Sequence, residues 1–261
     1  MGNYLSVAID LARQAGKVQM DHLGRVKTIE RKGAINLVTE VDKLCEKLIF
    51  DGLQKAFPNH DVLGEEGIAT RRESEFRWIV DPLDGTTNYA HSFPFFGVSI
   101  ALEHKGDIIC GVIYDPVREE LFAAEKGKGT TLNGDPVRVS AAGNLKESLL
   151  ATGFAYSVHE EGRPDNLDNF EAFIKTALAV RRPGAAAIDL AYVACGRLDG
   201  FWELFLKSWD IAAGVLIIRE AGGLVTNFDG TPVDIYGIEI LASNGKIHEE
   251  MINVLGNREC H

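Results

Sequence analysis

The sequence predicts an α/β fold in which sheets and helices form layers, rather than one doubly wound sheet. Three observations support this prediction. Amphipathic helical patterns open the chain, a meander of short strand signals follows, and helices alternate with strands after about residue 145. With 261 residues, the chain can form one large domain or two smaller domains that share an interface.

The composition excludes several classes of protein. Hydrophobic residues make up 46% and charged residues 25%, which is typical of a globular protein and not of a disordered chain. The 27 Lys and Arg against 38 Asp and Glu give a net charge of −11, which argues against broad neutralisation of nucleic-acid phosphates. The four cysteines form no C-x-x-C pair, and the longest apolar run, residues 211–218, is too short to span a membrane. We therefore expect a cytoplasmic protein without a membrane segment.

The N-terminal part of the chain predicts two helices with a basic segment between them. Apolar residues at helical spacing predict the first helix at residues 4–18. The basic residues 27–33 predict an exposed loop or ribbon. Thr39 and Asp42 have the spacing of a capping box, and they open a second helix that Pro58 ends.

Short strand signals come next, bounded by turn residues. We expect these strands at residues 61–63, 77–80, 97–104, 107–114 and 120–124. Lys105 and Gly106 separate the third strand from the fourth, so these strands form a meander.

The second half of the chain predicts alternating elements. We expect strands at 149–151, 201–204 and 224–226, and helices at 167–178, 185–196 and 209–221. Phe201 and Trp202 are expected in the core. His248, with the two glutamates that follow it, is expected on an exposed face.

The run from Trp78 to Asn88 is the most informative for function. An apolar strand ends at Asp81, Pro82 is expected to fix a turn, and Asp84 follows. Gly85 then allows close backbone approach before a helix start. Carboxylates at the end of a strand suit Mg²⁺, and free N–H groups at a helix start suit a phosphate.

A single aspartate in such a turn would be only a solvated cap. Acidic residues recur in similar settings, however. Glu65 and Glu66 follow the strand at 61–63, Asp210 lies at a predicted helix start, and Asp42 lies in the first turn of another helix. The set predicts one site that binds metal ions and a phosphate together.

Three motifs resemble the signatures of the inositol monophosphatase family, in the same order and spacing: residues 64–66, 81–88 and 209–214. Residues 32–42 resemble its N-terminal loop and following helix, with Asn36 where many relatives carry Asp, and residues 181–191 resemble its substrate-side motif. The resemblance covers nearly the whole chain. It implies an α-β-α-β-α sandwich of the Mg²⁺-dependent sugar phosphatase type, lithium sensitivity and a homodimer.

The resemblance also implies a role for individual residues. The ligands of two or three Mg²⁺ would be Glu65, Asp81, the Leu83 carbonyl, Asp84 and Asp210. Glu65 and Thr86 would orient a metal-bound water, and Asp42 would support Thr86. The Gly85 and Thr86 amides would hold the phosphate. The alcohol side would be lined by Gly184, Ala185, Ala186 and Glu203, with Asp84 and Asp210 also touching sugar hydroxyls.

We therefore expect residues 1–261 to form a single unit, with a metal-binding half at 1–145 and an α/β half at 146–261 that completes the site. The resemblance implies hydrolysis of a small phosphorylated polyol, inositol 1-phosphate, to myo-inositol and phosphate by in-line attack of the metal-activated water. Relatives use the same core on fructose 1,6-bisphosphate, histidinol phosphate or 3′-phosphoadenosine nucleotides, so these substrates remain alternatives.

Two other interpretations are weaker. Haloacid-dehalogenase phosphatases use an aspartyl nucleophile in an Asp-x-Asp pair, whereas Asp81 and Asp84 are three residues apart. Bacterial relatives also act as accessory factors of the transcription machinery. In this chain the basic pairs at 71–72 and 181–182 are small, and they do not indicate nucleic-acid binding.

Overall fold

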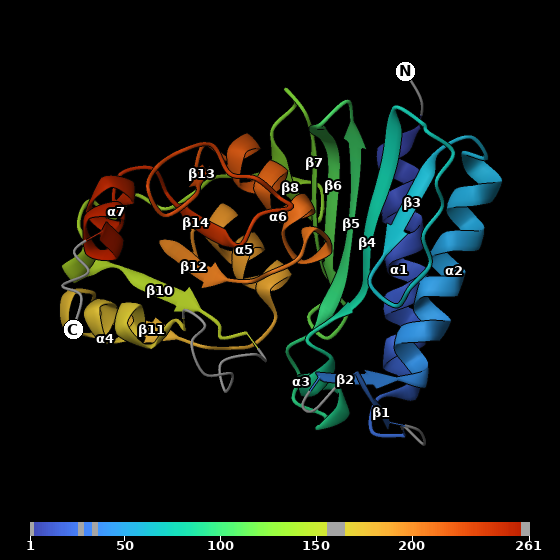
Figure 1. Cartoon of the computed structure of the whole chain (residues 1–261), viewed down its shortest axis with the longest axis horizontal. Coiled ribbons are helices and arrows are strands. Elements are labelled where there is room, and N and C mark those ends of the chain that lie inside the picture. Colours follow the sequence, from blue (N-terminus) through green and yellow to red (C-terminus); the bar gives the residue numbers. More distant parts are fainter. Residues whose placement is uncertain (1–2, 26–28, 33–35, 156–164, 257–261) are drawn as a thin grey trace.

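Five layers in the order α-β-α-β-α make up the computed structural model, which describes residues 3–25, 29–32, 36–155 and 165–256 (Figure 1). The predicted sandwich is therefore confirmed. The first layer contains α1 (Tyr4–His22) and α2 (Glu40–Ala56), which cover one face of a seven-stranded sheet. The predicted capping box of α2 is present. The Thr39 side chain accepts a hydrogen bond from a backbone N–H in the first turn, and the Asp42 side chain accepts one from the Thr39 N–H.

The seven-stranded sheet is the second layer, and it has the order β3-β4-β5-β6-β7-β8-β9. Its strands are β3 (Asp61–Gly64), β4 (Phe76–Asp84), β5 (Gly97–His104), β6 (Asp107–Asp115), β7 (Glu120–Glu125), β8 (Thr130–Leu132) and β9 (Asp135–Val137). Only β3 and β4 pair in parallel; the other neighbours in this sheet are antiparallel. The predicted meander is thus confirmed and continues for two short strands that the sequence did not predict.

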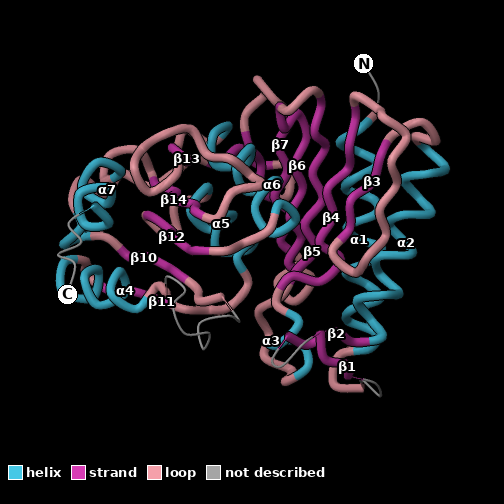
Figure 2. The backbone as a smooth tube through the Cα atoms, viewed as in Figure 1, coloured by secondary structure: helices cyan, strands magenta, loops and turns pink. Residues whose placement is uncertain are grey.

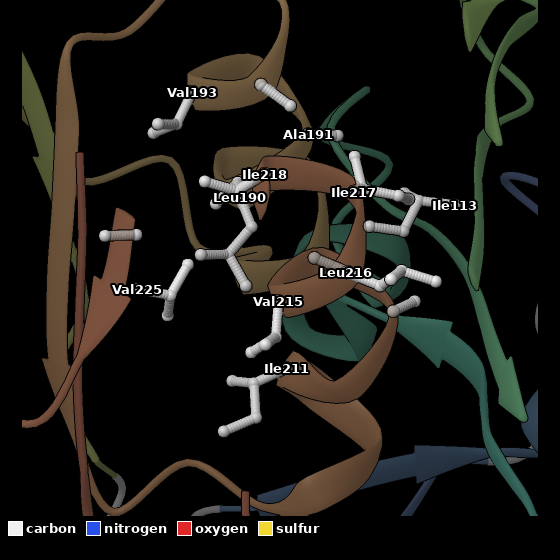
Figure 3. Packing of buried hydrophobic residues seen from close by; sticks show 14 of the residues in the cluster. Ile113, Leu190, Ala191, Val193, Ile211, Val215, Leu216, Ile217, Ile218 and Val225 are labelled. Carbon is white, nitrogen blue, oxygen red and sulfur yellow. The ribbon is translucent and has the colours of Figure 1, made fainter. Parts of the chain in front are cut away.

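The central layer consists of α5 (Ala186–Ala194) and α6 (Ser208–Glu220), which are packed between the two sheets. Because α6 has a sheet on either side, its residues from Ile211 to Ile218 are all buried. Figure 3 shows Leu190 of α5 and Val215 of α6 in one cluster with Ile113 of β6. This cluster joins the two halves of the chain.

The five-stranded sheet forms the fourth layer, with the order β11-β10-β12-β14-β13. Its strands are β10 (Leu149–Thr152), β11 (Ala179–Arg181), β12 (Gly200–Leu204), β13 (Leu224–Thr226) and β14 (Glu239–Ser243). The outer layer contains α4 (Leu167–Thr176) and α7 (His248–Gly256), and η1 (Leu145–Glu147) precedes β10. Phe201 and Trp202 are fully buried, as predicted.

Two small elements lie near one end of the sandwich. The ribbon of β1 (Ile29–Lys32) and β2 (Asn36–Thr39) is antiparallel, and β2 contacts the short helix α3 (Thr86–Ala90) (Figure 2). Residues 33–35 and the side chain of Asn36 lie outside what the structure describes. Within the described ranges, no helix combines the length and apolar character needed to cross a membrane.

Two predictions about individual residues are wrong. Pro82 does not end its strand: β4 continues to Asp84, with a shift of register between Asp81 and Asp84 where the sheet bulges. Proline lacks an N–H, and a bulge is one of the few places where a sheet tolerates it. His248 is not exposed either, because its ring lies buried between the hydroxyls of Thr226 and Ser243, 2.9 and 2.8 Å away.

Candidate active site

The predicted site residues meet in one cleft of about 470 Å³, at the point where the end of β4 faces the starts of α5 and α6. All of them except Asp42 line this cleft. Asp42 lies directly behind it, in contact with Thr86. Residues more than a hundred positions apart in the sequence are brought together here by the sandwich.

The end of β4 contributes two buried carboxyls on either side of the bulge. Asp81 is 1% exposed and Asp84 is 8% exposed. Oδ1 of Asp81 accepts a hydrogen bond from the Leu83 N–H, at 2.9 Å. Oδ2 of Asp84 accepts one from the Ala187 N–H at the start of α5, at 2.7 Å. The second bond ties the two halves of the chain together at the floor of the cleft.

Two further carboxyls reach the same place from other elements. Glu65 follows β3, and its N–H donates to the Val80 carbonyl of β4, which keeps it beside the end of that strand. Asp210 lies in the first turn of α6, where its Oδ2 accepts a hydrogen bond from the Lys207 N–H at 2.7 Å. The negative charge of Asp210 acts on Asp81, so these two carboxyls lie near each other.

Burial and the repulsion of neighbouring negative charges raise the pKa of Asp81, Asp84 and Asp210. Burial is the main cause for Asp81, and the negative charges of Glu65, Asp84 and Asp210 raise its pKa further. Burial also raises the pKa of Asp84 to about 7, with a further contribution from Glu65. Burial raises the pKa of Asp210 to about 7, with a further contribution from Asp84.

The donor set fits a hard divalent cation. Carboxylates and the backbone carbonyl of Leu83 are the oxygen ligands that Mg²⁺ takes, and the negative charges around Asp81 call for a counter-charge. Among the described residues, however, no three acidic, His or Cys side chains are already arranged around one ion position.

Thr86 and Asp42 form a fixed pair next to the carboxyls. Oγ1 of Thr86 lies 2.9 Å from Oδ1 of Asp42 and 3.1 Å from the Leu83 carbonyl. The hydroxyl has one proton, and the carboxylate is the stronger acceptor. The other oxygen of Asp42 accepts from the Thr39 N–H at 2.8 Å, so the capping box of α2 also orients this carboxyl. Burial raises the pKa of Asp42.

Backbone N–H groups lie beside the carboxyls because the segment that contains Gly85 and the segment that contains Gly184 approach each other closely. Gly85 has a φ of 86°, and a Cβ atom there would lie 3.0 Å from the Phe95 carbonyl oxygen. Asn88 donates from Nδ2 to the Phe95 and Pro183 carbonyls, at 2.8 and 2.9 Å. This side chain holds the segment with Gly184 against α3, so the starts of α3 and α5 border the same cleft.

Glu203 also lines the cleft. This residue lies on β12, is 7% exposed, and packs over Gly153, where an added Cβ would lie only 2.3 Å from Oε2. Burial raises its pKa, as do the charges of Asp210 and Asp84, while Arg182 acts in the other direction. Gly184, Ala185 and Ala186 line the cleft as well, and Gly184 and Ala185 lie next to Gly85.

Sequence reasoning missed several residues of the cleft. Asn88 and Asp189 lie inside recognised motifs, but nothing in the sequence gave them a role. Arg182, which we expected to be only a surface charge, lines the cleft, and so does Lys207, for which we made no prediction from the sequence. No sequence pattern indicated Gly153. A glycine is needed there because the side chain of Glu203, fifty residues later, occupies the space that a Cβ atom would take.

The sequence pattern that defines the inositol monophosphatase family matches residues 1–259. The chain belongs to the inositol monophosphatase family. It is 45% identical to a Synechocystis protein named inositol-1-monophosphatase, over 97% of this chain and 88% of that protein. It is 42% identical to a Pseudomonas aeruginosa protein named Nus factor SuhB, over 96% of this chain and 95% of that protein. The solved structure of an inositol monophosphatase from Anabaena (Nostoc) superposes with a TM-score of 0.89 and 42% identity, covering 97% of this chain and 95% of the other.

Membership of the inositol monophosphatase family establishes the class of reaction. Its members are metal-dependent enzymes that hydrolyse phosphate monoesters, and this chain is therefore a phosphoric monoester hydrolase. The cleft agrees with that class, because it combines a set of hard-cation ligands with backbone N–H groups suited to an anion.

Proposed function

We propose that this enzyme uses two or three Mg²⁺ to hydrolyse inositol 1-phosphate to myo-inositol and phosphate. The observation that carries the proposal is the set of residues gathered in one cleft. Glu65, Asp81, Asp84 and Asp210 line this cleft together with Glu203 and Gly184. The names of the Synechocystis and Anabaena relatives support the choice of substrate.

The chemistry divides between the ions and the protein. Bound Mg²⁺ neutralises the phosphate charge, lowers the pKa of a water and stabilises the leaving alkoxide. The protein positions the water. Thr86 donates its only proton to Asp42, so its oxygen lone pairs remain available to accept a hydrogen bond from the water that attacks phosphorus. Glu65 lines the same cleft, and in this proposal it shares the task.

The phosphate and the alcohol are held by different groups. The Gly85 and Thr86 amides, at the tight turn before α3, would bind phosphate oxygens. Glu203 and the backbone around Gly184 and Ala186 offer hydrogen-bond acceptors and donors to the alcohol. A polyol can satisfy several such buried groups at once, which favours it over an apolar alcohol.

The test is phosphate release from a panel of monoesters, ranked by kcat/KM over a range of Mg²⁺ concentrations. The panel contains inositol 1-phosphate, fructose 1,6-bisphosphate, histidinol phosphate and a 3′-phosphoadenosine nucleotide. We expect inositol 1-phosphate to rank first. A tenfold preference for any other member would reject the assigned substrate and leave the class of enzyme unchanged.

The direct attack of water has its own test. A phosphate ester that is chiral at phosphorus through isotopic labels inverts its configuration in a single in-line displacement. An aspartyl phosphate intermediate would give two inversions and net retention. We expect inversion, because Asp81 and Asp84 are both engaged with backbone N–H groups and surrounded by the charges of a cation site.

Two statements about partners also belong to this proposal. We propose a homodimer, as the family resemblance implies, with sedimentation velocity as its test. The 42% identity to a protein named Nus factor SuhB raises a second role as an accessory factor of the transcription machinery. Co-purification with that machinery, compared between the native enzyme and the inactive Asp81→Asn variant, would separate such a role from catalysis.

A further inference from the structure

One buried amide lies behind the cation site and takes no part in the mechanism above. Gln19 is in the last turn of α1, and its side chain is fully buried. Its Nε2 donates a hydrogen bond to the Pro82 carbonyl, at 2.8 Å. Pro82 stands between Asp81 and Asp84, inside the bulge of β4. A helix of the first layer is therefore bonded directly to the segment that carries two of the proposed cation ligands.

The bulge explains why this segment needs a bond from outside the sheet. Pro82 and Leu83 have no partner residue in β5, because the register shifts there. Nε2 of Gln19 also lies 3.5 Å from the carbonyl oxygen of Gly97, the residue of β5 that pairs with Asp84. The amide thus contacts both strands where the register changes. Since an interrupted ladder holds the backbone less firmly, the amide supplies a donor that the ladder does not.

The other end of the same side chain is costly for stability. Oε1 of Gln19 is buried and has no hydrogen-bond partner among the described residues. An unpaired buried acceptor destabilises a fold, and an apolar side chain of similar length would avoid that penalty. Native proteins rarely keep such a group without a reason, and here the reason is the bond that Nε2 makes to the bulge.

The backbone of Gln19 holds a second part of the site. Oη of Tyr89 donates to the Gln19 carbonyl at 2.7 Å, and Tyr89 is fully buried in α3. The same helix begins at Thr86, whose Oγ1 lies 3.1 Å from the Leu83 carbonyl oxygen. One residue of α1 is thus bonded to the bulge through its side chain and to α3 through its carbonyl.

We propose that Gln19 is a positioning residue for Mg²⁺, which acts by holding the Pro82 carbonyl. That bond fixes the bulge, and the bulge sets where Asp81, the Leu83 carbonyl and Asp84 stand relative to one another. Gln19 itself is fully buried and does not line the cleft, so it acts through the backbone of β4. This inference rests on the proposed function, which makes those three groups cation ligands.

The test is the Mg²⁺ affinity of Gln19→Met, measured by titration calorimetry on the metal-free enzyme. Methionine has nearly the length of glutamine, but it cannot donate to the Pro82 carbonyl. We expect the Kd for Mg²⁺ to increase about tenfold, as is typical when a group that supports metal ligands is removed. The melting temperature without Mg²⁺ should stay within about 4 °C, because the variant leaves the Pro82 carbonyl unpaired but removes the unpaired Oε1. Turnover at saturating Mg²⁺ should stay within about threefold, since the Gln19 carbonyl still holds α3.

Thr130→Val is the matched control. Thr130 is also buried, and its Oγ1 donates to the Ile217 carbonyl of α6 at 2.6 Å, so valine removes one buried donor of the same kind. Thr130 does not line the cleft. This variant should lower the melting temperature and leave the Kd for Mg²⁺ within about twofold.

Three results would overturn the inference. An unchanged Kd for Mg²⁺ in Gln19→Met would show that the bond to the bulge does not set the ligand geometry. An equal loss of Mg²⁺ affinity in Gln19→Met and Thr130→Val would show a general loosening of the fold. A Gln19→Met chain that does not fold would show that the amide is kept for stability.

The calorimetric readout separates this inference from the proposed function. If the native enzyme binds no Mg²⁺, the proposed ligand set fails and the role of Gln19 falls with it. If the native enzyme binds Mg²⁺ and Gln19→Met binds it equally well, only the role of Gln19 fails. The titration needs no substrate, so its result does not depend on which phosphate monoester the enzyme hydrolyses.

Discussion

Buried carboxyls occur in two kinds of surroundings in this enzyme. Away from the cleft, each has donors of its own. Asp61 accepts from the N–H groups of Arg72 and Ser74, at 2.6 and 3.2 Å. Asp115 accepts from two backbone N–H groups and from the Arg118 guanidinium at 2.8 Å. These carboxyls hold loops in place, and their local partners account for their burial.

In the cleft, the neighbours of a buried carboxyl include other carboxyls. Asp81 and Asp84 each accept backbone hydrogen bonds, but burial and negative neighbours still raise their pKa. The same residue type is therefore stabilised by the fold in one region and left short of positive charge in the other. What distinguishes an active-site carboxyl here is the counter-charge that the chain leaves out, rather than burial itself.

Removing one carboxyl from the cation site should have the largest effect. In Asp81→Asn, turnover should fall by about 10⁴-fold, since a cation ligand supports several kcal/mol of transition-state stabilisation. The fold should be unchanged, because the amide keeps an acceptor for the Leu83 N–H and removes one repelling charge. Phosphate release and circular dichroism would be measured together. Near-normal turnover at saturating Mg²⁺ would contradict the assigned ligand set.

Changing Thr86 should have a smaller effect, because its side chain orients the water and is not a ligand of the cations. We expect Thr86→Ala to lower kcat by about 10²-fold, the lower end of the range for positioned proton transfer. Its apparent Mg²⁺ affinity should stay within about threefold, since the carboxyls remain. Thr86→Ser keeps the hydroxyl that donates to Asp42 and should recover most of the rate. Equal losses in both variants would show that the methyl group, not the hydroxyl, matters.

The sequence predicted local features well, because their causes are local. The capping box of α2 lies within four residues, and the strand limits of β5 follow from the turn residues around it. The prediction for Pro82 was wrong because a bulge depends on how β5 pairs with β4, which no window of sequence contains. The burial of His248 depends in the same way on Thr226, twenty-two residues earlier.

The candidate site could be assembled from motifs, but its physical basis could not. The resemblance placed Asp42 beside Thr86, and the structure contains that hydrogen bond across forty-four residues. By contrast, the clamp from Asn88 to the Pro183 carbonyl spans ninety-five residues, and no pattern predicted it. Such features depend on contacts between distant parts of the chain, so a residue can belong to a motif without the motif indicating what that residue contacts.

Adding Mg²⁺ should stabilise the enzyme in a pH-dependent way. The pKa of Asp84 and of Asp210 is about 7 in the folded chain, above the ordinary value of 3.8. Between these values the folded metal-free protein binds more protons than the unfolded chain, so its free energy of unfolding decreases as the pH rises through 7. At pH 8, Mg²⁺ at a hundred times its Kd should raise the melting temperature by roughly 5–10 °C. Differential scanning fluorimetry should find a smaller increase at pH 6, and an equal or larger one would contradict the assignment.

The smallest expected effect is a change in the free energy of unfolding when a buried carboxyl is replaced by an amide. It is the most direct test of the two kinds of carboxyl, because we expect a decrease away from the cleft and an increase inside it. With Mg²⁺ removed by a chelator at pH 8, Asp61→Asn should lower the free energy of unfolding by about 1–3 kcal/mol, since it weakens charge-assisted bonds to the Arg72 and Ser74 N–H groups. Asp84→Asn should raise it, because the amide oxygen can still accept from the Ala187 N–H while one repelling charge disappears. Urea unfolding of both variants and the native enzyme gives the comparison. If Asp84→Asn is destabilised as much as Asp61→Asn, then the hydrogen bond to α5 outweighs the repulsion, and the cleft carboxyls would be structural in the metal-free protein.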